Sequence, residues 1–536
     1  MRHPLLASVL MTCLAVTPAL AQQHEHGAQP AERLGKVHFQ TSCSAEVQPA
    51  FDRAVALLHS FWYAAAANAF QDVIKRDPSC AIAHWGIALS GWGNPFGGTR
   101  TPETFTRGLA AVAAGRAAQP NTPRERAYLD AVELLYKDAD KLDHPTRATA
   151  YEEAMARLVA THPDDTEAAI FYAIALDAAS PSTDKKYTKQ LKAAGILEKA
   201  FAAQPDHPGI AHYLIHTYDV PALAEKGLSA ARRYAGIAPD APHALHMPSH
   251  IFTRVGAWED SVSSNRASAA AASKAGAPAE ELHAMDYQVY AYLQLAQDAE
   301  AARVKAEADA VIKRVEVSGG YGLAGFFAAA AIPARVALER GDWAAASSLT
   351  PLTGTFPATE AITWFARTLG AARSGNAADA EASAAKLEPL RQRLIQAKDA
   401  YWADQVDIQR KLADGWVLFA KGDRDKALGL VREAATQEDA TDKSPVTPGP
   451  LAPARELLGE MLLDAGRPAD ALAEFETVMR KEPGRFRAIA GAMRAAAMAK
   501  QDAKARNYAA ALVALAKGSD GKRPALTEAK TIASGK

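Results

Sequence analysis

Residues 206–250 read DHPGIAHYLIHTYDVPALAEKGLSAARRYAGIAPDAPHALHMPSH, and this stretch contains the clearest repeat in the chain. A segment that begins at Pro208 runs to Pro242, and these two prolines are 34 positions apart. A fixed interval of roughly 20–50 residues indicates a supersecondary unit that recurs along the chain. Because one helical hairpin is too small to bury its apolar face alone, such units stack on their neighbours. The stretch therefore predicts a solenoid.

The composition of the 536-residue chain favours helices. Apolar residues make up 49% of it, and much of this fraction is alanine, which has the highest helix propensity. Runs of β-branched residues of strand length are scarce. We therefore expect an all-α fold, an α-solenoid of antiparallel helix pairs. Acidic and basic residues nearly cancel, to a formal net charge of −1, and no basic stripe is present, so nucleic acid is not an expected partner.

A similar pattern of helix-packing and turn residues recurs in other parts of the chain. The second helix of a hairpin near the N-terminus has a pattern of four positions: an aromatic residue, a small residue, another aromatic residue and a closing proline. The last three of these positions are found again near the C-terminus. Glycine followed by a polar or turn residue marks the turn between two helices. These positions are Tyr63, Ala66, Phe70 and Pro78, then Ala471, Phe475 and Pro483, with the turns at Gly256, Gly341, Gly422 and Gly466.

These residues resemble the tetratricopeptide repeat family, whose unit is a 34-residue helix–turn–helix closed by a proline. The resemblance implies a superhelix of helix pairs whose first helices line a concave groove. That groove would bind a protein, a peptide or a small molecule. The run from His212 to Trp258 is also similar to a group of exported bacterial repeat proteins. The resemblance is best at 51–92, 208–272, 335–350 and 415–500.

Residues 1–21 have the three-part pattern of a secretory signal peptide. Arg2 is the positive n-region, residues 5–16 are the apolar core, and the Ala-Leu-Ala at 19–21 is the cleavage site. The alternative is a buried N-terminal helix. We expect a periplasmic or secreted protein that keeps no transmembrane anchor after the signal is cleaved.

The rest of the chain divides by composition. We expect a flexible N-terminal segment over 22–36 and tetratricopeptide-like helical repeats over 37–515. Two insertions interrupt the repeats: a turn-rich loop at 93–100 and a connector at 443–453 with four prolines, which should be stiff and extended. The connector is either a plain linker or a lid across the groove. Residues 516–536 are expected to be a fraying C-terminal tail.

Cleavage of the signal leaves two cysteines, Cys43 and Cys80. An even pair in an oxidising compartment predicts a disulfide, and the alternative is two buried free thiols. The spacing is not C-x-x-C, which argues against a redox-active pair.

Histidines concentrate in the repeat stretch, and their spacing follows the repeat. His212 and His216 are four positions apart, so they lie on one face of a helix. His246 and His250 have the same spacing, 34 positions later. Neighbouring helices pack roughly 8–10 Å apart, so the four imidazoles can converge on a common point. The tetratricopeptide resemblance implies that all four face the concave groove.

Further side chains near these histidines extend the candidate set. His243 precedes His246, and His283 opens the next helical segment. Two aspartates stand one turn away from a histidine and could ligate directly or orient an imidazole. The candidate metal ligands are His212, His216, His243, His246 and His250, with Asp219, His283 and Asp286 as additional or second-shell groups. Such a site suits Zn, Cu, Ni or Fe.

Three interpretations of the histidines remain open. They could bind a metal, they could bind a peptide or small molecule without metal, or they could pack structurally and have been copied by duplication. The glutamate of the zinc-protease motif is absent, because Tyr213 and Met247 occupy its place. Our leading hypothesis is an exported binding scaffold with a metal or ligand site. The alternative is a metal-dependent enzyme, hydrolytic or redox, for which the pattern names no catalytic residue.

A second group of histidine and aromatic residues lies in and after the first hairpin. His59, Trp62 and Tyr63 are expected to pack in the core. His84 and Trp85 open the next helix and either pack there or reach the groove.

Overall fold

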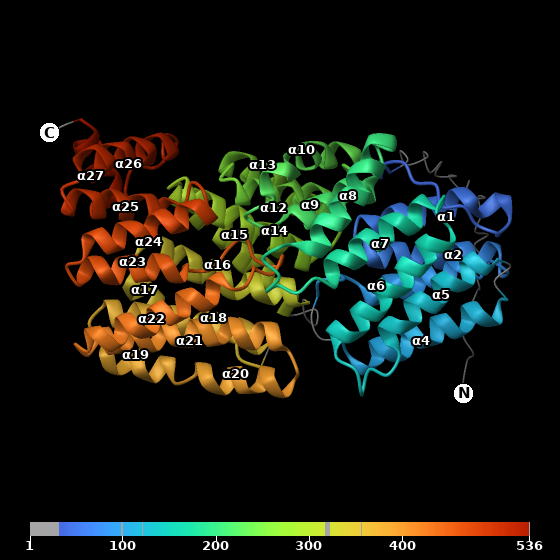
Figure 1. Cartoon of the computed structure of the whole chain (residues 1–536), viewed down its shortest axis with the longest axis horizontal. Helices are drawn as coiled ribbons and strands as arrows, with labels where there is room; N and C mark the ends of the chain where they lie inside the picture. The colour runs from blue at the N-terminus through green and yellow to red at the C-terminus, as the bar shows by residue number, and fades with distance from the viewer. Residues whose placement is uncertain (1–31, 98–99, 120–121, 317–321, 355, 535–536) are drawn as a thin grey trace, which may run out of the picture. The chain divides into compact units, whose positions relative to one another are not determined.

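The computed structural model describes residues 32–97, 100–119, 122–316, 322–354 and 356–534. All regular elements among these residues are helical, and no strand occurs in them. Consecutive helices lie side by side in pairs that run back and forth (Figure 1). The predicted all-α solenoid is confirmed, and the fold is a tetratricopeptide-like helical repeat. The predicted signal peptide at 1–21 lies outside the described residues.

The first part of the chain, blue to cyan in Figure 1, precedes the repeat stretch. Its helices are η1 (Ala45–Val47), α1 (Gln48–His59), α2 (Tyr63–Arg76), α3 (Ile82–Trp92), α4 (Pro102–Ala117), α5 (Pro123–Tyr136), α6 (His144–Thr161), α7 (Thr166–Ala178) and α8 (Thr188–Ala203).

The repeat stretch and the helices that follow it form the middle of the chain. They are α9 (Pro208–Tyr218), η2 (Ala224–Gly227), α10 (Leu228–Ile237), α11 (Pro242–His246), α12 (Pro248–Arg254), α13 (Trp258–Lys274), α14 (Pro278–Gln294) and α15 (Asp298–Glu316).

The last part of the chain runs from yellow to red in Figure 1. Its helices are α16 (Leu323–Arg340), α17 (Trp343–Ser347), α18 (Pro357–Arg373), α19 (Ala377–Ala384), α20 (Leu387–Gln396), α21 (Ala400–Ala420), α22 (Arg424–Asp439), α23 (Ala454–Asp464), α24 (Pro468–Lys481), α25 (Phe486–Met498), α26 (Asp502–Leu515) and α27 (Pro524–Ala533). None of the helices in the described part of the chain has both the length and the apolar composition that a bilayer span requires.

The repeat prolines stand at helix starts. Pro208 and Pro242 are the first residues of α9 and α11. Proline costs nothing there, because the first N–H groups of a helix have no intrahelical acceptor, and its fixed φ suits the helix. The turn glycines Gly256 and Gly341 adopt positive φ, +74° and +66°, a conformation that favours glycine.

Aromatic residues of the repeat pattern pack against glycines of the following helix. A Cβ at Gly86 in α3 would lie 2.4 Å from the ring of Phe70 in α2. A Cβ at Gly491 in α25 would lie 2.4 Å from the ring of Phe475 in α24. In both pairs the glycine follows the aromatic residue by 16 positions, so the two ends of the chain use the same packing.

Both ends of the described chain are held by contacts. The backbone N–H of Arg33 donates to Asp240 at 2.7 Å, and that of Lys36 donates to the carbonyl of Asp206 at 3.0 Å. These residues belong to the segment predicted to be flexible over 22–36, of which 22–31 lie outside the described residues. The structure also differs from the fraying tail predicted over 516–536. Pro524 begins α27, which buries Leu526 and Ala529 against α26.

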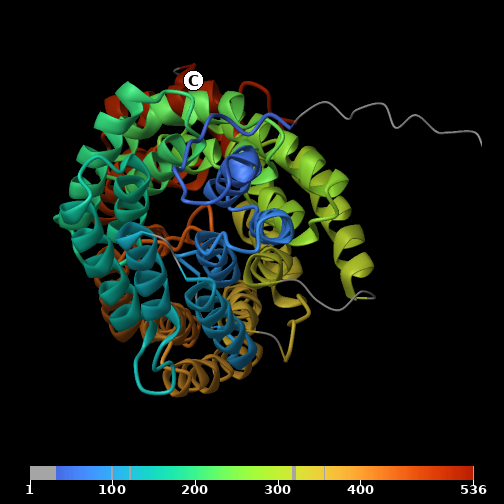
Figure 2. The same ribbon diagram turned by 90° about the vertical axis from the view of Figure 1, so that its right-hand side faces the viewer.

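The two predicted insertions are loops. Residues 93–97 and 100 form an irregular loop, and 98–99 lie outside the described residues. The connector at 443–453 is also irregular, but none of its residues is exposed. In Figure 2 it is the orange irregular segment seen in the middle of the view, with helices around it. It is therefore a half-buried to buried segment packed against helices, and it differs from a plain surface linker.

A disulfide links the start of the chain to the turn after α2. Cys43 and Cys80 are bonded, with their Cα atoms 4.7 Å apart. The bond ties residues before α1 to the start of α3, so the N-terminal hairpin is closed covalently.

Candidate functional site

Two neighbouring repeats position four of the candidate histidines. His212 and His216 project from α9, and His246 and His250 from the α11–α12 segment. Pro248 splits that segment, because proline has no N–H to donate to the preceding turn. The backbone of Met247 nevertheless stays helical, at φ −53° and ψ −37°, so the four-residue spacing of the two histidines is kept.

The imidazoles form one continuous cluster together with His243 and His283. Ring centroids lie 4.8 Å apart for His212 and His216 and 4.9 Å apart for His246 and His250. The two pairs meet between His216 and His250, at 5.9 Å. No member of the cluster is more than 9% exposed. The side chains therefore converge, but they are buried, whereas the resemblance implied that they face a concave groove.

The first group within the cluster contains His212, His216 and His243. One nitrogen from each lies within 4.8 Å of the others. His212 Nδ1 donates to the carbonyl of His59 at 2.6 Å, which leaves the lone pair on Nε2. His243 Nδ1 lies 3.3 Å from the carboxylate of Glu280. The Nε2 atoms of His212 and His243 and both ring nitrogens of His216 have no hydrogen-bond partner.

The second group contains His246, His250 and His283, again with one nitrogen from each within 4.8 Å of the others. His246 Nδ1 lies 2.7 Å from Asn265 Oδ1, and His250 Nδ1 lies 2.8 Å from Asp219 Oδ2. His283 Nδ1 has no partner. Asp219 thus contacts the ring of His250 from outside the three histidines.

The hydrogen bonds of the second group fix the tautomers of two rings. Asn265 Nδ2 donates to the carbonyl of Ser261 at 2.7 Å, so Asn265 Oδ1 must accept from His246. An ionised Asp219 must likewise accept from His250. Both neutral rings then carry a lone pair on Nε2, and these two atoms are 3.0 Å apart. Facing lone pairs repel, so this contact is unfavourable between two neutral rings in these tautomers.

Burial keeps these imidazoles neutral. Loss of hydration lowers the pKa of His212, His216 and His246 well below their ordinary range, and the neighbouring histidines add to the shift. It lowers the pKa of His250 to about 4 and that of His283 to about 3. A neutral imidazole is the form that binds a metal.

Asp219 is a buried carboxylate that pairs with two cationic side chains beside His250. Burial opposes its ionisation, but Lys443 and Arg254 outweigh burial and hold the pKa of this carboxyl well below its usual range. Lys443 Nζ lies 3.0 Å from Asp219 Oδ2, and Arg254 Nε donates to Asp219 Oδ1 at 2.8 Å. The carboxylate therefore stays charged and holds the His250 ring in place.

Asp286, one of the predicted ligands, is not part of the cluster. Its carboxylate pairs with Arg335 Nε at 2.8 Å, and both side chains are completely buried. The prediction rested on helical spacing from His283, but α16 presents a guanidinium to this face of α14. Arg335 also donates to Thr447 Oγ1 at 2.7 Å and to the carbonyl of Gly449 at 3.0 Å, so the pair holds the connector.

The connector covers the second group of histidines. Tyr287, whose ring lies 4.7 Å from His246 and 5.0 Å from His250, donates to the carbonyls of Pro445 and Thr447 at 2.8 and 3.0 Å. With Lys443 bound to Asp219, the connector closes this side of the cluster.

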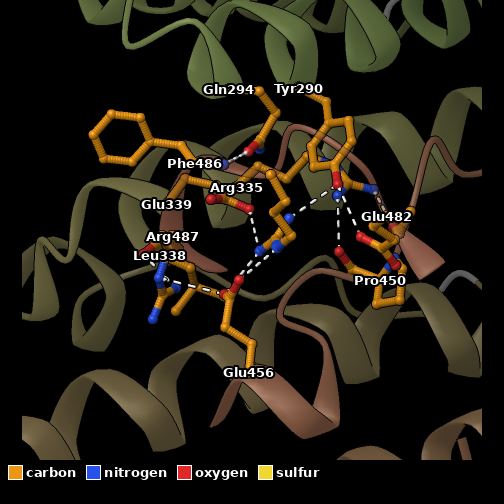
Figure 3. A network of polar contacts seen from close by, with 12 residues as sticks. Tyr290, Gln294, Arg335, Leu338, Glu339, Pro450, Glu456, Glu482, Phe486 and Arg487 are labelled. Atoms are coloured by element: carbon orange, nitrogen blue, oxygen red, sulfur yellow. Dashed lines mark hydrogen bonds and ion pairs between the residues drawn. The ribbon is translucent and has the colours of Figure 1, made fainter. Parts of the chain in front are cut away.

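A buried ionic network anchors the far end of the connector. Figure 3 shows Arg335, Tyr290 and Glu456 pointing into one interior space. Arg335 Nη1 donates to the carbonyl of Pro450 at 3.4 Å, and Arg485 donates to Glu456 at 2.6 Å and to Tyr290 at 2.9 Å. These groups come from α14, α16 and α23 and from the turn before α25, so the connector is fixed to several helices.

A third group, His59, Glu167 and His207, differs from the first two. Its two imidazoles each lie 2.9 Å from one carboxylate oxygen of Glu167. His59 Nδ1 lies 3.0 Å from Tyr213 Oη, and His207 Nδ1 accepts from the backbone N–H of Ile210 at 3.3 Å. Every ring nitrogen in this group has a partner. The prediction that His59 packs in the core agrees with this position, and the group is a satisfied structural network.

Phe61 forms a wall of the first group. Its ring centroid lies 4.3 Å from that of His212, 5.6 Å from that of His216 and 5.4 Å from that of His243. Phe61 follows the C-terminus of α1 at φ +53°, where glycine is the usual residue. Phe61 also lines an apolar pocket together with Tyr213. The aromatic side chain thus contacts both the histidines and the pocket from a position with unfavourable backbone geometry.

The sequence did not reveal several of these groups. Asn265, Lys443 and Phe61 do not share the 34-residue spacing of the histidines, and only the three-dimensional structure brings them to the cluster. Glu280 does follow His246 by 34 positions, but the sequence places a glutamate there instead of a third histidine. The positive φ of Phe61 left no signal either, because the sequence has no glycine there.

No protein-family model matches this chain, and no curated protein matches it. Solved structures with helical repeats match over most of its length, at low similarity. The structure of the APC/C hetero-tetramer Cut9–Hcn1 is 12% identical, with 90% of each chain covered and a TM-score of 0.31. The human IFIT1 dimer with m7Gppp-AAAA is 11% identical, with 85% of this chain and 89% of that chain covered and a TM-score of 0.33.

The structure of Naa15/Naa10 bound to HypK-THB is 12% identical, with 91% of this chain and 72% of that chain covered and a TM-score of 0.21. Similarities this low carry no functional argument. The site is therefore interpreted from its own geometry.

Proposed function

We propose that this protein is an exported helical-repeat scaffold whose histidine cluster binds a transition metal. The observation that carries the proposal is a set of buried imidazoles with unpaired ring nitrogens. Four of the rings, His212, His243, His246 and His250, are hydrogen-bonded through one nitrogen to a group outside the histidines, and ring nitrogens of His212, His216, His243 and His283 have no partner. Leaving a buried acceptor unpaired costs about 1–3 kcal/mol, so several together require an explanation. Metal-bound histidines have this arrangement, with the second ring nitrogen donating to a carbonyl or carboxylate.

Imidazole ligands suit Zn, Cu, Ni or Fe, the metals that the sequence suggested. Export is supported by the disulfide between Cys43 and Cys80, because such bonds persist in oxidising compartments. We assign the protein to the periplasm or the extracellular space. As in other repeat scaffolds, a partner protein, a peptide or a small molecule would bind on the helical surface.

A metal-dependent enzyme, hydrolytic or redox, is the second candidate. It is favoured by the number of ligands, because each group offers three protein nitrogens. Catalytic zinc sites also have three protein ligands and leave one position for water or substrate. An exchangeable position can be detected in cobalt-loaded protein, whose visible spectrum should change when azide is added. An unchanged spectrum would point to a closed, structural site.

The metal content of the native protein tests the proposal. The protein should be purified without an affinity tag from its own compartment and measured by elemental analysis. We expect near-stoichiometric transition metal and its loss in a His216→Ala, His250→Ala double variant. His38→Ala is the matched control, because this side chain is 73% exposed and far from the cluster in sequence. Metal-free native protein, or metal retained by the double variant, contradicts the proposal.

A further inference from the structure

The six clustered histidines divide into two groups of three. One nitrogen from each of His212, His216 and His243 lies within 4.8 Å of the other two. The same holds for His246, His250 and His283, but the six nitrogens together do not meet this limit. Since a metal–imidazole bond is about 2.0–2.1 Å long, nitrogens bound to one ion lie within roughly twice that distance. A single ion therefore cannot use all six rings.

Each group also has its own outer hydrogen bonds. The first is held by the carbonyl of His59 and by the carboxylate of Glu280. The second is held by Asn265 and by the carboxylate of Asp219. In both groups, then, one ring is oriented by a carboxylate and another by an amide oxygen. Outer groups of this kind fix the tautomer and direction of metal-ligating histidines.

Each group has unpaired or mutually facing ring nitrogens of its own, so the case for a bound cation is separate for the two groups. In the first, four buried ring nitrogens have no hydrogen-bond partner. In the second, the facing Nε2 atoms of His246 and His250 are 3.0 Å apart, and His283 Nδ1 has no partner. An ion in one group would leave the unpaired nitrogens of the other unchanged.

We propose that the cluster is a two-metal centre, with one divalent transition ion bound by His212, His216 and His243 and a second bound by His246, His250 and His283. This inference rests on the proposed metal binding and adds its stoichiometry and ligand sets. The two ions would be close neighbours, because rings of different groups approach to 5.9 Å for His216 and His250 and for His243 and His246.

The geometry also predicts how the two ions differ. The second group is covered by the connector, through Lys443 on Asp219 and Tyr287 on Pro445. The first is covered by Phe61, a single side chain that also lines an apolar pocket. The ion in the first group should therefore be the more accessible of the two and should be removed first by a chelator.

Zinc loading of the full-length protein tests the proposal. Chelator-stripped protein is incubated with excess zinc, desalted and analysed for zinc per chain. We expect two zinc ions in the native sequence and in the His38→Ala control. One should remain in a His212→Gln, His243→Gln variant and one in a His246→Gln, His283→Gln variant. Circular dichroism checks that each variant is folded.

Each outcome has a distinct meaning. No zinc in the native sequence overturns the proposed function as well as the two-metal centre. One zinc, lost in both variants, overturns the two-metal centre alone, and so does the loss of both ions from a folded variant.

A readout on the native sequence needs no variant. Fully copper(II)-loaded protein should show a dipolar-broadened or diminished electron paramagnetic resonance signal, because the two spins are close. An unbroadened signal at full loading contradicts a pair of neighbouring ions.

Discussion

At the scale of single residues, the site depends on which nitrogen of each imidazole is free. His246 and His207 are both buried, but only His246 has a free nitrogen that faces a second acceptor. In the Glu167 group every nitrogen is paired, so histidine alone does not define a metal site here. What distinguishes the candidate metal site is the tautomer of each ring. A residue outside the candidate ligands accepts a hydrogen bond from one ring nitrogen, which leaves the lone pair on the other.

Removing such an outer partner should weaken the metal without removing a ligand. Asn265→Leu keeps the size of the side chain but deprives His246 Nδ1 of its acceptor. We expect metal affinity to fall about 10- to 100-fold, the usual effect of losing a second-shell partner. Competition with a chromophoric chelator measures this. Asn68→Leu, an exposed change on α2, is the control and should leave affinity unaltered; an equal loss in both variants would disprove a role for Asn265.

Phe61 should control how fast the metal leaves. Phe61→Ala removes the ring between the first histidine group and the apolar pocket. We expect the same metal content at equilibrium but faster transfer of metal to an added chelator, followed by stopped-flow absorbance. Phe419→Ala, which truncates another half-buried phenylalanine at the end of α21, should show the native rate. An unchanged rate in Phe61→Ala would mean that the metal leaves by another route.

At the scale of helices, the repeat depends on glycines that let neighbours approach. Gly86→Ala would bring a Cβ to 2.4 Å from the ring of Phe70. Overpacking of this kind costs about 1–3 kcal/mol, which should appear as a lower free energy of unfolding in urea. Gly195→Ala in α8 meets nothing within 4 Å and should be neutral or stabilising. Equal stability of the two variants would contradict this account of the packing.

The stability of the fold at the end of the connector should depend on pH through Glu438 on α22. Burial raises the pKa of Glu438 to about 7, and its carboxylate accepts from the backbone N–H of Ala454 at 2.9 Å. An unfolded glutamate has a pKa near 4.5, so the folded state binds the extra proton between these values. Its contribution to stability is therefore lost as pH rises from about 4.5 to 7.

Glu438→Gln keeps an acceptor for Ala454 but cannot ionise. We expect the variant to have a higher melting temperature than the native protein at pH 8 and the same melting temperature at pH 4.5. Calorimetry at the two pH values checks this. A gain of equal size at both would show that ionisation of Glu438 is not the cause.

At the scale of the whole molecule, the sequence predicted those features that repeat with a fixed period along the chain. The 34-residue interval placed His212 and His246 on equivalent faces, and the shared spacing of small residue, aromatic residue and proline placed Phe70 and Phe475 at equivalent packing positions. Residues one period apart occupy equivalent faces of neighbouring helices, and which face a residue occupies follows from local helix geometry alone. It therefore predicted the helical fold and the convergence of two histidine pairs.

The division of the cluster into two groups could not be predicted in this way. His283 lies 37 positions after His246, outside the 34-residue spacing, and joins it because α14 packs against α11. Asp286 has the right helical spacing, yet α16 supplies Arg335 to neutralise it. The connector has no period at all, and its place against Tyr287 depends on contacts more than 150 positions apart in sequence.

Anomalous diffraction from crystals of zinc-loaded protein, recorded at the zinc absorption edge, tests the metal-centre account most directly. We predict two strong peaks in the interior, one surrounded by His212, His216 and His243 and the other by His246, His250 and His283. An absence of peaks among these six side chains, in crystals that bind zinc only at surface histidines, would contradict the account.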